Sequence, residues 1–176
     1  VSEVHTIVAT ENKQPLYRTE GIVSKLQLNS DTYLVWEHQG ASDFYKLRAQ
    51  SLPVHYKSVS AGVTGQHVQS TNVNKSSFHD EIGLVARVNG KITKEFAGKA
   101  DLRYFPETRT IDTYAFVSHP KVLIDVLGSY DTSKDKYSIR PGLEYKLNSH
   151  ASIGLESKFT TDKKTDYEAL RIKYSF

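Results

Sequence analysis

Charged residues recur at every second position in several segments of this 176-residue chain. In residues 136–147, for example, Arg140, Glu144 and Lys146 alternate with apolar neighbours such as Leu143. Successive side chains of a β-strand point to opposite faces, so this spacing places the charges on one face of a strand. A charged face can set the sign of the solutes that pass beside it, or its charges can pair into a ladder that fills a closed interior. The residues assigned to this face are Lys46, Arg48, Arg87, Glu95, Lys99, Asp101, Arg103, Arg140, Glu144, Lys146, Glu156, Lys158, Arg171 and Lys173, with Lys25, Glu81 and Asp125 as further candidates.

One compact group, Ser77, His79 and Glu81, has the residue types of nucleophilic catalysis. Such catalysis requires a serine oxygen within hydrogen-bond reach of a base that a third group holds in place. On a strand these three alternate residues share a face, but their spacing of about 7 Å is too long for direct contact. We therefore expect no catalytic residues and no enzymatic activity.

Metal and cofactor sites are not predicted either. The seven histidines are scattered near turns, without carboxylates at chelating spacing, which favours solvated side chains over a metal site. The glycine-containing segment 61–65 is not followed by a helix that could complete a phosphate site. The chain has no cysteine, so disulfides and thiolate ligands are excluded.

The elements that must carry the charged face are β-strands. Alternation and turn residues predict about twelve of them. Each is roughly 9–14 residues long, close to the roughly 9–11 residues that a tilted membrane strand needs. The last one places Leu170 and Phe176 on an apolar face, opposite Arg171 and Lys173. The predicted strands span residues 1–10, 16–28, 32–39, 43–52, 54–64, 77–88, 91–105, 109–118, 121–130, 136–147, 151–160 and 166–176.

Two kinds of connection are expected to alternate along the chain. One set is tight and includes Asn89-Gly90, a strong hairpin signal, and a break at Leu52-Pro53. The other set is longer on average and includes the polar segment 65–76. Short turns at one edge and longer loops at the other are typical of bacterial outer-membrane barrels, and an even strand number puts both termini at the edge of the short turns.

Composition supports a barrel with one apolar face. Only 38% of the residues are hydrophobic, although the chain reads as strand almost throughout. No apolar run approaches the roughly 18 residues of a membrane helix. The chain begins at Val1 without a charged and then apolar leader, so we expect a processed form with a single domain, residues 1–176. A net charge of +3 without a concentrated basic stretch predicts no nucleic-acid partner.

Aromatic residues are predicted near both ends of the strands. Tyr104 and Phe105 belong to a set near the outer ends, and Tyr33 and Tyr145 belong to a set near the inner ends. Two such belts are expected of a membrane protein, because an aromatic ring with a polar group prefers the level of the lipid headgroups.

The strand pattern, the rhythm of connections, the aromatic positions and the terminal Tyr174-Ser175-Phe176 make the whole chain resemble a Gram-negative outer-membrane β-barrel, a porin-like protein. The terminal aromatic resembles the signal by which such proteins are recognised for assembly. Within that class, about twelve strands, small loops and a charged interior are similar to the oligogalacturonate-specific porin family. The resemblance implies an all-β, transmembrane, antiparallel up-and-down β-barrel of about twelve strands, with ten or eight as alternatives.

From these observations we expect a monomeric channel of the bacterial outer membrane for passive diffusion of small, preferentially anionic solutes such as acidic oligosaccharides. Its other partners would be membrane lipids, lipopolysaccharide and the outer-membrane assembly machinery. A non-conducting structural or adhesion barrel, an outer-membrane lipid-modifying enzyme and a soluble ligand-binding calyx remain alternatives. The soluble calyx remains because alternation alone does not say which face of the sheet points outward.

Overall fold

The computed structural model describes the backbone of residues 2–11, 14–29, 31–39, 44–72, 75–163 and 166–175, and the side chains of residues 26–29, 31–36, 46–69, 79–163, 166 and 168–174. These residues form β-strands joined by turns, and among them no helix is long and apolar enough to cross a membrane. The strands are β1 Ser2–Glu11, β2 Gln14–Gln27, β3 Thr32–Gln39, β4 Phe44–Tyr56, β5 Val59–Asn72, β6 Lys75–Lys91, β7 Ala97–Phe105, β8 Thr110–Ser118, β9 Val122–Asp131, β10 Lys136–Lys146, β11 Ala151–Thr160 and β12 Tyr167–Ser175.

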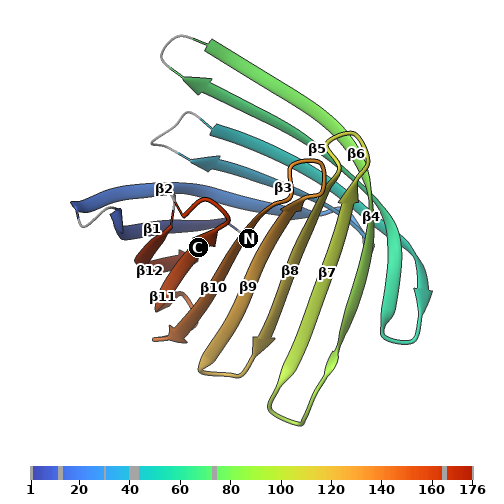
Figure 1. Ribbon diagram of the computed structural model, residues 1–176. Helices are drawn as coiled ribbons and strands as arrows, with labels where there is room; N and C mark the ends of the chain where they lie inside the picture. Colours follow the sequence, from blue (N-terminus) through green and yellow to red (C-terminus); the bar gives the residue numbers. More distant parts are fainter. Residues whose placement is uncertain are drawn as a thin grey trace.

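Strands that follow one another in the chain pair antiparallel, and β1 pairs with both β2 and β12. Figure 1 shows the resulting curved sheet, in which β1 lies beside β12. The pair of Glu3 with Ser175 brings both ends of the chain to one edge, which we call the terminal edge. The turns after β2, β4, β6, β8 and β10 lie at this edge, and the other connections lie at the opposite edge. The predicted all-β, antiparallel up-and-down architecture is confirmed.

Side chains along the strands alternate between an exposed apolar face and a sheltered polar face. In β7, Asp101 and Arg103 are only 3% and 6% exposed, whereas Leu102 and Tyr104 are 49% and 41% exposed. Soluble proteins show the opposite arrangement, because water favours burial of the apolar face. An apolar face turned outward over many strands is the arrangement expected where hydrocarbon surrounds the sheet.

The predicted turn at Asn89-Gly90 is wrong. These residues continue β6 in register with β7, and the chain reverses over 92–96 instead. In this turn Thr93 Oγ1 accepts hydrogen bonds from two backbone N–H groups, at 3.2 Å each. A threonine side chain can satisfy turn N–H groups in this way, and the later reversal also adds backbone pairs to the β6–β7 ladder.

The predicted break at Leu52-Pro53 is also wrong. The register of β4 against β5 shifts between Ser51 and Val54, which is a β-bulge inside β4. The chain turns later, at 57–58, where Lys57 adopts a left-handed φ of 53°. Proline has no N–H to donate to a ladder, and a bulge is a position in a strand where none is needed.

The longest predicted loop, 65–76, is mostly strand. β5 and β6 pair without interruption from Val59 opposite Val88 to Asn72 opposite Lys75, and only residues 73–74 of the connection lie outside the described part. The predicted contrast between a tight edge and an edge with this long loop therefore fails here. Polar composition indicated a loop, but ladder pairs with β4 and β6 hold the segment extended, so tertiary context overrides propensity.

Two aromatic residues that the sequence placed in membrane belts are instead buried on the inward face. Phe105 is 0% exposed and packs over Gly83, where an added Cβ would lie 2.7 Å from the Phe105 ring. Tyr33 is buried too, together with Leu52 and Val85. Side chains therefore fill part of the space inside the curve, next to β3–β7.

Candidate functional site

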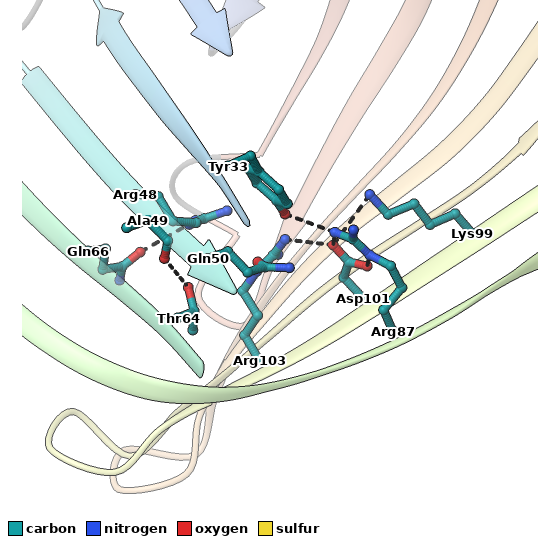
Figure 2. A network of polar contacts seen from close by, with 10 residues as sticks. All are labelled: Tyr33, Arg48, Ala49, Gln50, Thr64, Gln66, Arg87, Lys99, Asp101 and Arg103. Carbon is teal, nitrogen blue, oxygen red and sulfur yellow. Dashed lines mark hydrogen bonds and ion pairs between the residues drawn. The ribbon is translucent and has the colours of Figure 1, made fainter. Parts of the chain in front are cut away.

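Asp101, on the inward face of β7, is surrounded by basic side chains (Figure 2). Its carboxylate accepts hydrogen bonds from Arg87 Nε at 2.6 Å and from Arg87 Nη2 at 2.7 Å. Arg103 Nη2 donates to the same carboxylate at 2.8 Å, and Lys99 Nζ lies 3.7 Å from it. Planar guanidinium groups match carboxylates in this two-pronged geometry. Three cations thus share one carboxylate, and the group as a whole is positively charged.

Two neutral side chains extend this network to β3 and β4. Arg87 Nη2 donates to Tyr33 Oη at 2.8 Å, and Arg103 Nε donates to Gln50 Oε1 at 3.0 Å. In the sheet, β4 and β5 lie between β3 and β6, so Tyr33 and Arg87 can meet only on the concave side of a strongly curved sheet. Figure 2 shows Tyr33 reaching across the interior to Arg87. The polar face is therefore the inside of the curve.

A second chain of polar contacts lies toward the opposite edge. Arg48 Nη2 donates to Gln66 Oε1 at 3.4 Å, and the Gln66 side-chain amide donates to Glu81. The hydroxyl of Thr108, in the β7–β8 turn, donates to Glu81 Oε2 at 2.8 Å. These contacts join three neighbouring strands and a turn, and they hold Arg48 against the inward face.

Arg171, on β12, lies in a cluster of three carboxylates. Its Nη1 is 3.3 Å from Asp125 Oδ2 and 3.8 Å from Glu144 Oε2, and its Nη2 donates to Glu156. Lys173 Nζ lies 3.4 Å from the same Glu144 oxygen. The carboxylates come from β9, β10 and β11, so this cluster also spans the concave side. Here three carboxylates face two cations, the reverse of the balance around Asp101.

Gly142 makes room for the Arg171 cluster. An added Cβ at this position would overlap Asp125 Oδ1 and would lie 3.3 Å from Arg171 Nη2. Charges that leave water are stabilised only by close opposite charges and hydrogen bonds. A side chain at position 142 would push these groups apart, so the strand glycine has a packing role here.

Most of the charged residues predicted from the alternation lie on the sheltered, inward face. Glu95 does not: its position inside a strand is wrong, because the chain turns at 92–96 and the Glu95 side chain is exposed, with Oε2 3.7 Å from His119 Nε2. The side chain of Lys25, and Phe176 as a whole, lie outside the described residues. Buried or half-buried on the inward face are Lys46, Arg48, Glu81, Arg87, Lys99, Asp101, Arg103, Asp125, Arg140, Glu144, Lys146, Glu156, Lys158, Arg171 and Lys173.

Uncharged members of the site were missed, because the search followed charge. Gln50 shares a strand face with Lys46 and Arg48, so its position was a usable signal, whereas Gln66 lies in the segment that was predicted as a loop. Tyr33 was assigned to an aromatic belt at the membrane interface, although its hydroxyl accepts a hydrogen bond from Arg87. On β8, the rings of Tyr114 and Phe116 lie 5.7 Å apart on the same inward face.

The group Ser77, His79 and Glu81 on β6, which has the residue types of nucleophilic catalysis, is only partly described, since the Ser77 side chain lies outside the described residues. His79 Nε2 lies 3.5 Å from Glu81 Oε2, so the expectation that these two side chains are too far apart is wrong. Long side chains lean along the strand and shorten the spacing set by the backbone. Among the side chains that the structure describes, no group of three or more His, Cys, Asp or Glu residues could hold a metal ion.

A separate set of contacts links turns at the terminal edge. His55 Nε2 lies 2.8 Å from Asp31 Oδ1, and His55 Nδ1 lies 3.0 Å from Ser60 Oγ. Ser60 is buried. The three residues come from the β2–β3 turn, β4 and β5, so these contacts tie a turn to the neighbouring hairpin. Sequence spacing could not show this, because the segments meet only in the folded sheet.

Comparison with known proteins finds likeness in structure but not in sequence. No protein-family description and no curated protein sequence matches the chain. A KdgM porin in complex with disordered oligogalacturonate is 11% identical, with a TM-score of 0.62, covering 100% of this chain and 99% of that chain. A NanC porin is 9% identical, with a TM-score of 0.62 and the same coverage. The outer membrane protein Omp33 of Acinetobacter baumannii is 10% identical, with a TM-score of 0.61, covering 99% of this chain and 97% of that chain.

The chain therefore has the fold of outer-membrane porins over its full length. At the level of the fold, the resemblance to a porin-like β-barrel, and to the oligogalacturonate porins within that class, is confirmed.

Proposed function

We propose that this protein is a passive channel of the bacterial outer membrane for small, preferentially anionic solutes. It would act as one domain, residues 1–176, closed into a barrel of twelve strands. The pairing of β1 with both β2 and β12 supports closure, and the shared fold with porins supports the membrane location.

A lipid environment is supported by the outward face of the sheet. Large apolar side chains such as Ile82, Leu84 and Leu155 are well exposed there, at 76%, 61% and 62%. A contiguous apolar surface of this kind is unusual on a soluble protein. The soluble calyx is therefore disfavoured, because it would turn this face inward. Membrane lipids and lipopolysaccharide are then the natural neighbours of the outward face.

The observation that carries the anion preference is the excess of basic groups on the inward face. In a narrow passage with low-dielectric walls the field of such groups is focused, which raises the local concentration of anions. Among the described side chains, the buried or half-buried inward acids are Glu81, Asp101, Asp112, Asp125, Asp131, Glu144 and Glu156, and the inward bases that outnumber them are Lys46, Arg48, Arg87, Lys99, Arg103, Arg140, Lys146, Lys158, Arg171 and Lys173.

Acidic oligosaccharides are the solute class that we infer. They would cross the channel by diffusion, without covalent chemistry. One structure of the same fold is described as a porin in complex with oligogalacturonate, a polymer that carries repeated carboxylates. Basic groups spread over many strands suit such a ligand better than a single charged ring. We further infer a monomer without cofactor, assembled by the outer-membrane machinery.

Single-channel recording in planar bilayers tests this function. The refolded protein should give discrete current steps in KCl, and a salt gradient should give a reversal potential of the sign expected for chloride preference. Lys46→Gln combined with Arg48→Gln should reduce that preference, whereas Lys134→Gln, at an exposed turn, should leave it unchanged. Absence of current steps would favour a non-conducting structural barrel, and cation preference would contradict the charge argument.

Membrane insertion needs its own measurement. A folded outer-membrane barrel resists detergent and migrates differently on a denaturing gel before and after boiling. We expect that difference for this chain after refolding into detergent. Purification as a monodisperse protein without detergent would contradict the proposed location.

A further inference from the structure

Asp101 differs from the acids of the Arg171 cluster because three cations surround this one carboxylate, whereas three carboxylates share two cations there. Its carboxylate takes hydrogen bonds from Arg87 and Arg103, and Lys99 lies 3.7 Å away. A carboxylate of an acidic sugar has the same shape and charge as this side chain. The three basic groups therefore form a binding position for one carboxylate, and that position is filled by a residue of the protein itself.

The guanidinium groups of Arg87 and Arg103 keep capacity for a second partner. Within the described part of the chain, no group accepts a hydrogen bond from Nη1 of either Arg87 or Arg103. Tyr33 Oη also accepts from Arg87 Nη2, and Gln50 Oε1 accepts from Arg103 Nε, so these bonds help to fix the orientation of the two guanidinium groups. A solute carboxylate that approached them would be attracted by three cations and repelled by Asp101.

We propose that Asp101 is an internal counter-ion that competes with solute carboxylates for Arg87, Lys99 and Arg103, and so shortens the residence of acidic solutes in the channel. This inference rests on the proposed channel function. Conduction requires that a solute bind well enough to enter and weakly enough to leave. Three unopposed cations at one point would hold a polyanion, and Asp101 lowers that hold while keeping the two arginines in place.

Asp101→Asn is the informative variant, because it removes the charge and keeps the shape and one acceptor oxygen. Current through single channels would be recorded in KCl with trigalacturonate as the probe, and the mean duration of the current interruptions would be measured. One unit charge at about 6 Å from the bound carboxylate, at an effective dielectric constant of about 40, corresponds to roughly a tenfold change in dwell time. We expect interruptions about that much longer in the variant.

Lys99→Gln tests the same position from the other side, without touching the paired guanidinium groups. Interruptions should become shorter by a similar factor, so the inference stays testable even where Asp101→Asn does not fold, as judged by its migration before boiling. Unchanged dwell times in the Lys99 variant, or unchanged or shorter ones in Asp101→Asn, overturn the proposal.

Asp125→Asn serves as the charge-matched comparison, since it removes the same charge from the Arg171 cluster instead. If Asp125→Asn and Asp101→Asn lengthen the interruptions equally, the overall charge of the interior explains the effect and the proposal fails. A wild-type protein that gives no current in KCl alone defeats the proposed function, whereas a conducting protein with unaltered dwell times in the variants defeats only the role of Asp101.

Discussion

Replacement of Arg171 by methionine should destabilise the folded protein strongly. The variant keeps much of the apolar length of the side chain and removes the charge that three buried carboxylates share. Asp125, Glu144 and Glu156 are 5%, 4% and 3% exposed, so water does not replace the lost partner. Glu144 keeps a neighbour of opposite charge, Lys173, whose Nζ lies 3.4 Å from it.

The magnitude follows from the distances. At an effective dielectric constant of about 20, an ion pair at the observed 3.3–3.8 Å gains about 4–5 kcal/mol before the cost of desolvation. Desolvation offsets most of this gain while the pair is intact, but removal of one partner leaves buried charge and typically costs about 3–5 kcal/mol. Since total stabilities are about 5–15 kcal/mol, such a loss is large.

Urea unfolding in phospholipid vesicles measures this loss. Trp36 is the single tryptophan and lies on the outward face of β3, so its fluorescence reports departure from lipid. Lys134→Met, which breaks an exposed pair with Asp131, is the control and should change the midpoint little. A second substitution, Glu156→Gln, should recover part of the Arg171→Met loss. The reasoning is refuted if Arg171→Met and Lys134→Met shift the unfolding midpoint by the same small amount.

The same urea assay checks three further expectations. Phe105→Ala should cost about 3–5 kcal/mol, because the ring is completely buried over Gly83, and a loss below that of a conservative Phe105→Leu would contradict this. Tyr33→Phe should cost about 1–3 kcal/mol, because Arg87 loses a buried acceptor at 2.8 Å, and no change would show that another group takes its place. Gly142→Ala should cost about 1–3 kcal/mol by overpacking against the Arg171 cluster, and a neutral result would show that the cluster yields readily.

The strand face on which each charged residue lies was the part of the site that sequence reasoning could predict. Where a strand alternates cleanly, as in residues 136–147, one assignment of face is correct for every residue on it, so Arg140, Glu144 and Lys146 all lie inward. The assignment of Glu95 failed because a turn interrupts the strand that was thought to carry it. The misplaced turn did not change which face was assigned to the residues that follow it. Lys99 was therefore still assigned to the inward face.

Turn positions were harder to predict, because they depend on competition between neighbouring hydrogen bonds. Asn89-Gly90 has a strong intrinsic preference for a hairpin, yet the ladder with β7 and the Thr93 side chain favour a later reversal. The polar segment 65–76 shows the same effect, since its pairing with β4 and β6 outweighs its composition. Local preference amounts to about 1 kcal/mol per residue, which a run of ladder bonds exceeds.

By itself, the sequence determined that the chain is mostly strand, that strands such as residues 136–147 have one apolar and one charged face, and which charged residues of such a strand share a face. These follow from a period of two residues, a property of the backbone that requires no knowledge of the partners. The tertiary structure alone decided which charges meet. Arg87 reaches Tyr33, and Arg171 reaches Asp125, across intervening strands, because the sheet curves enough to bring residues far apart in the chain within hydrogen-bond distance on its concave side.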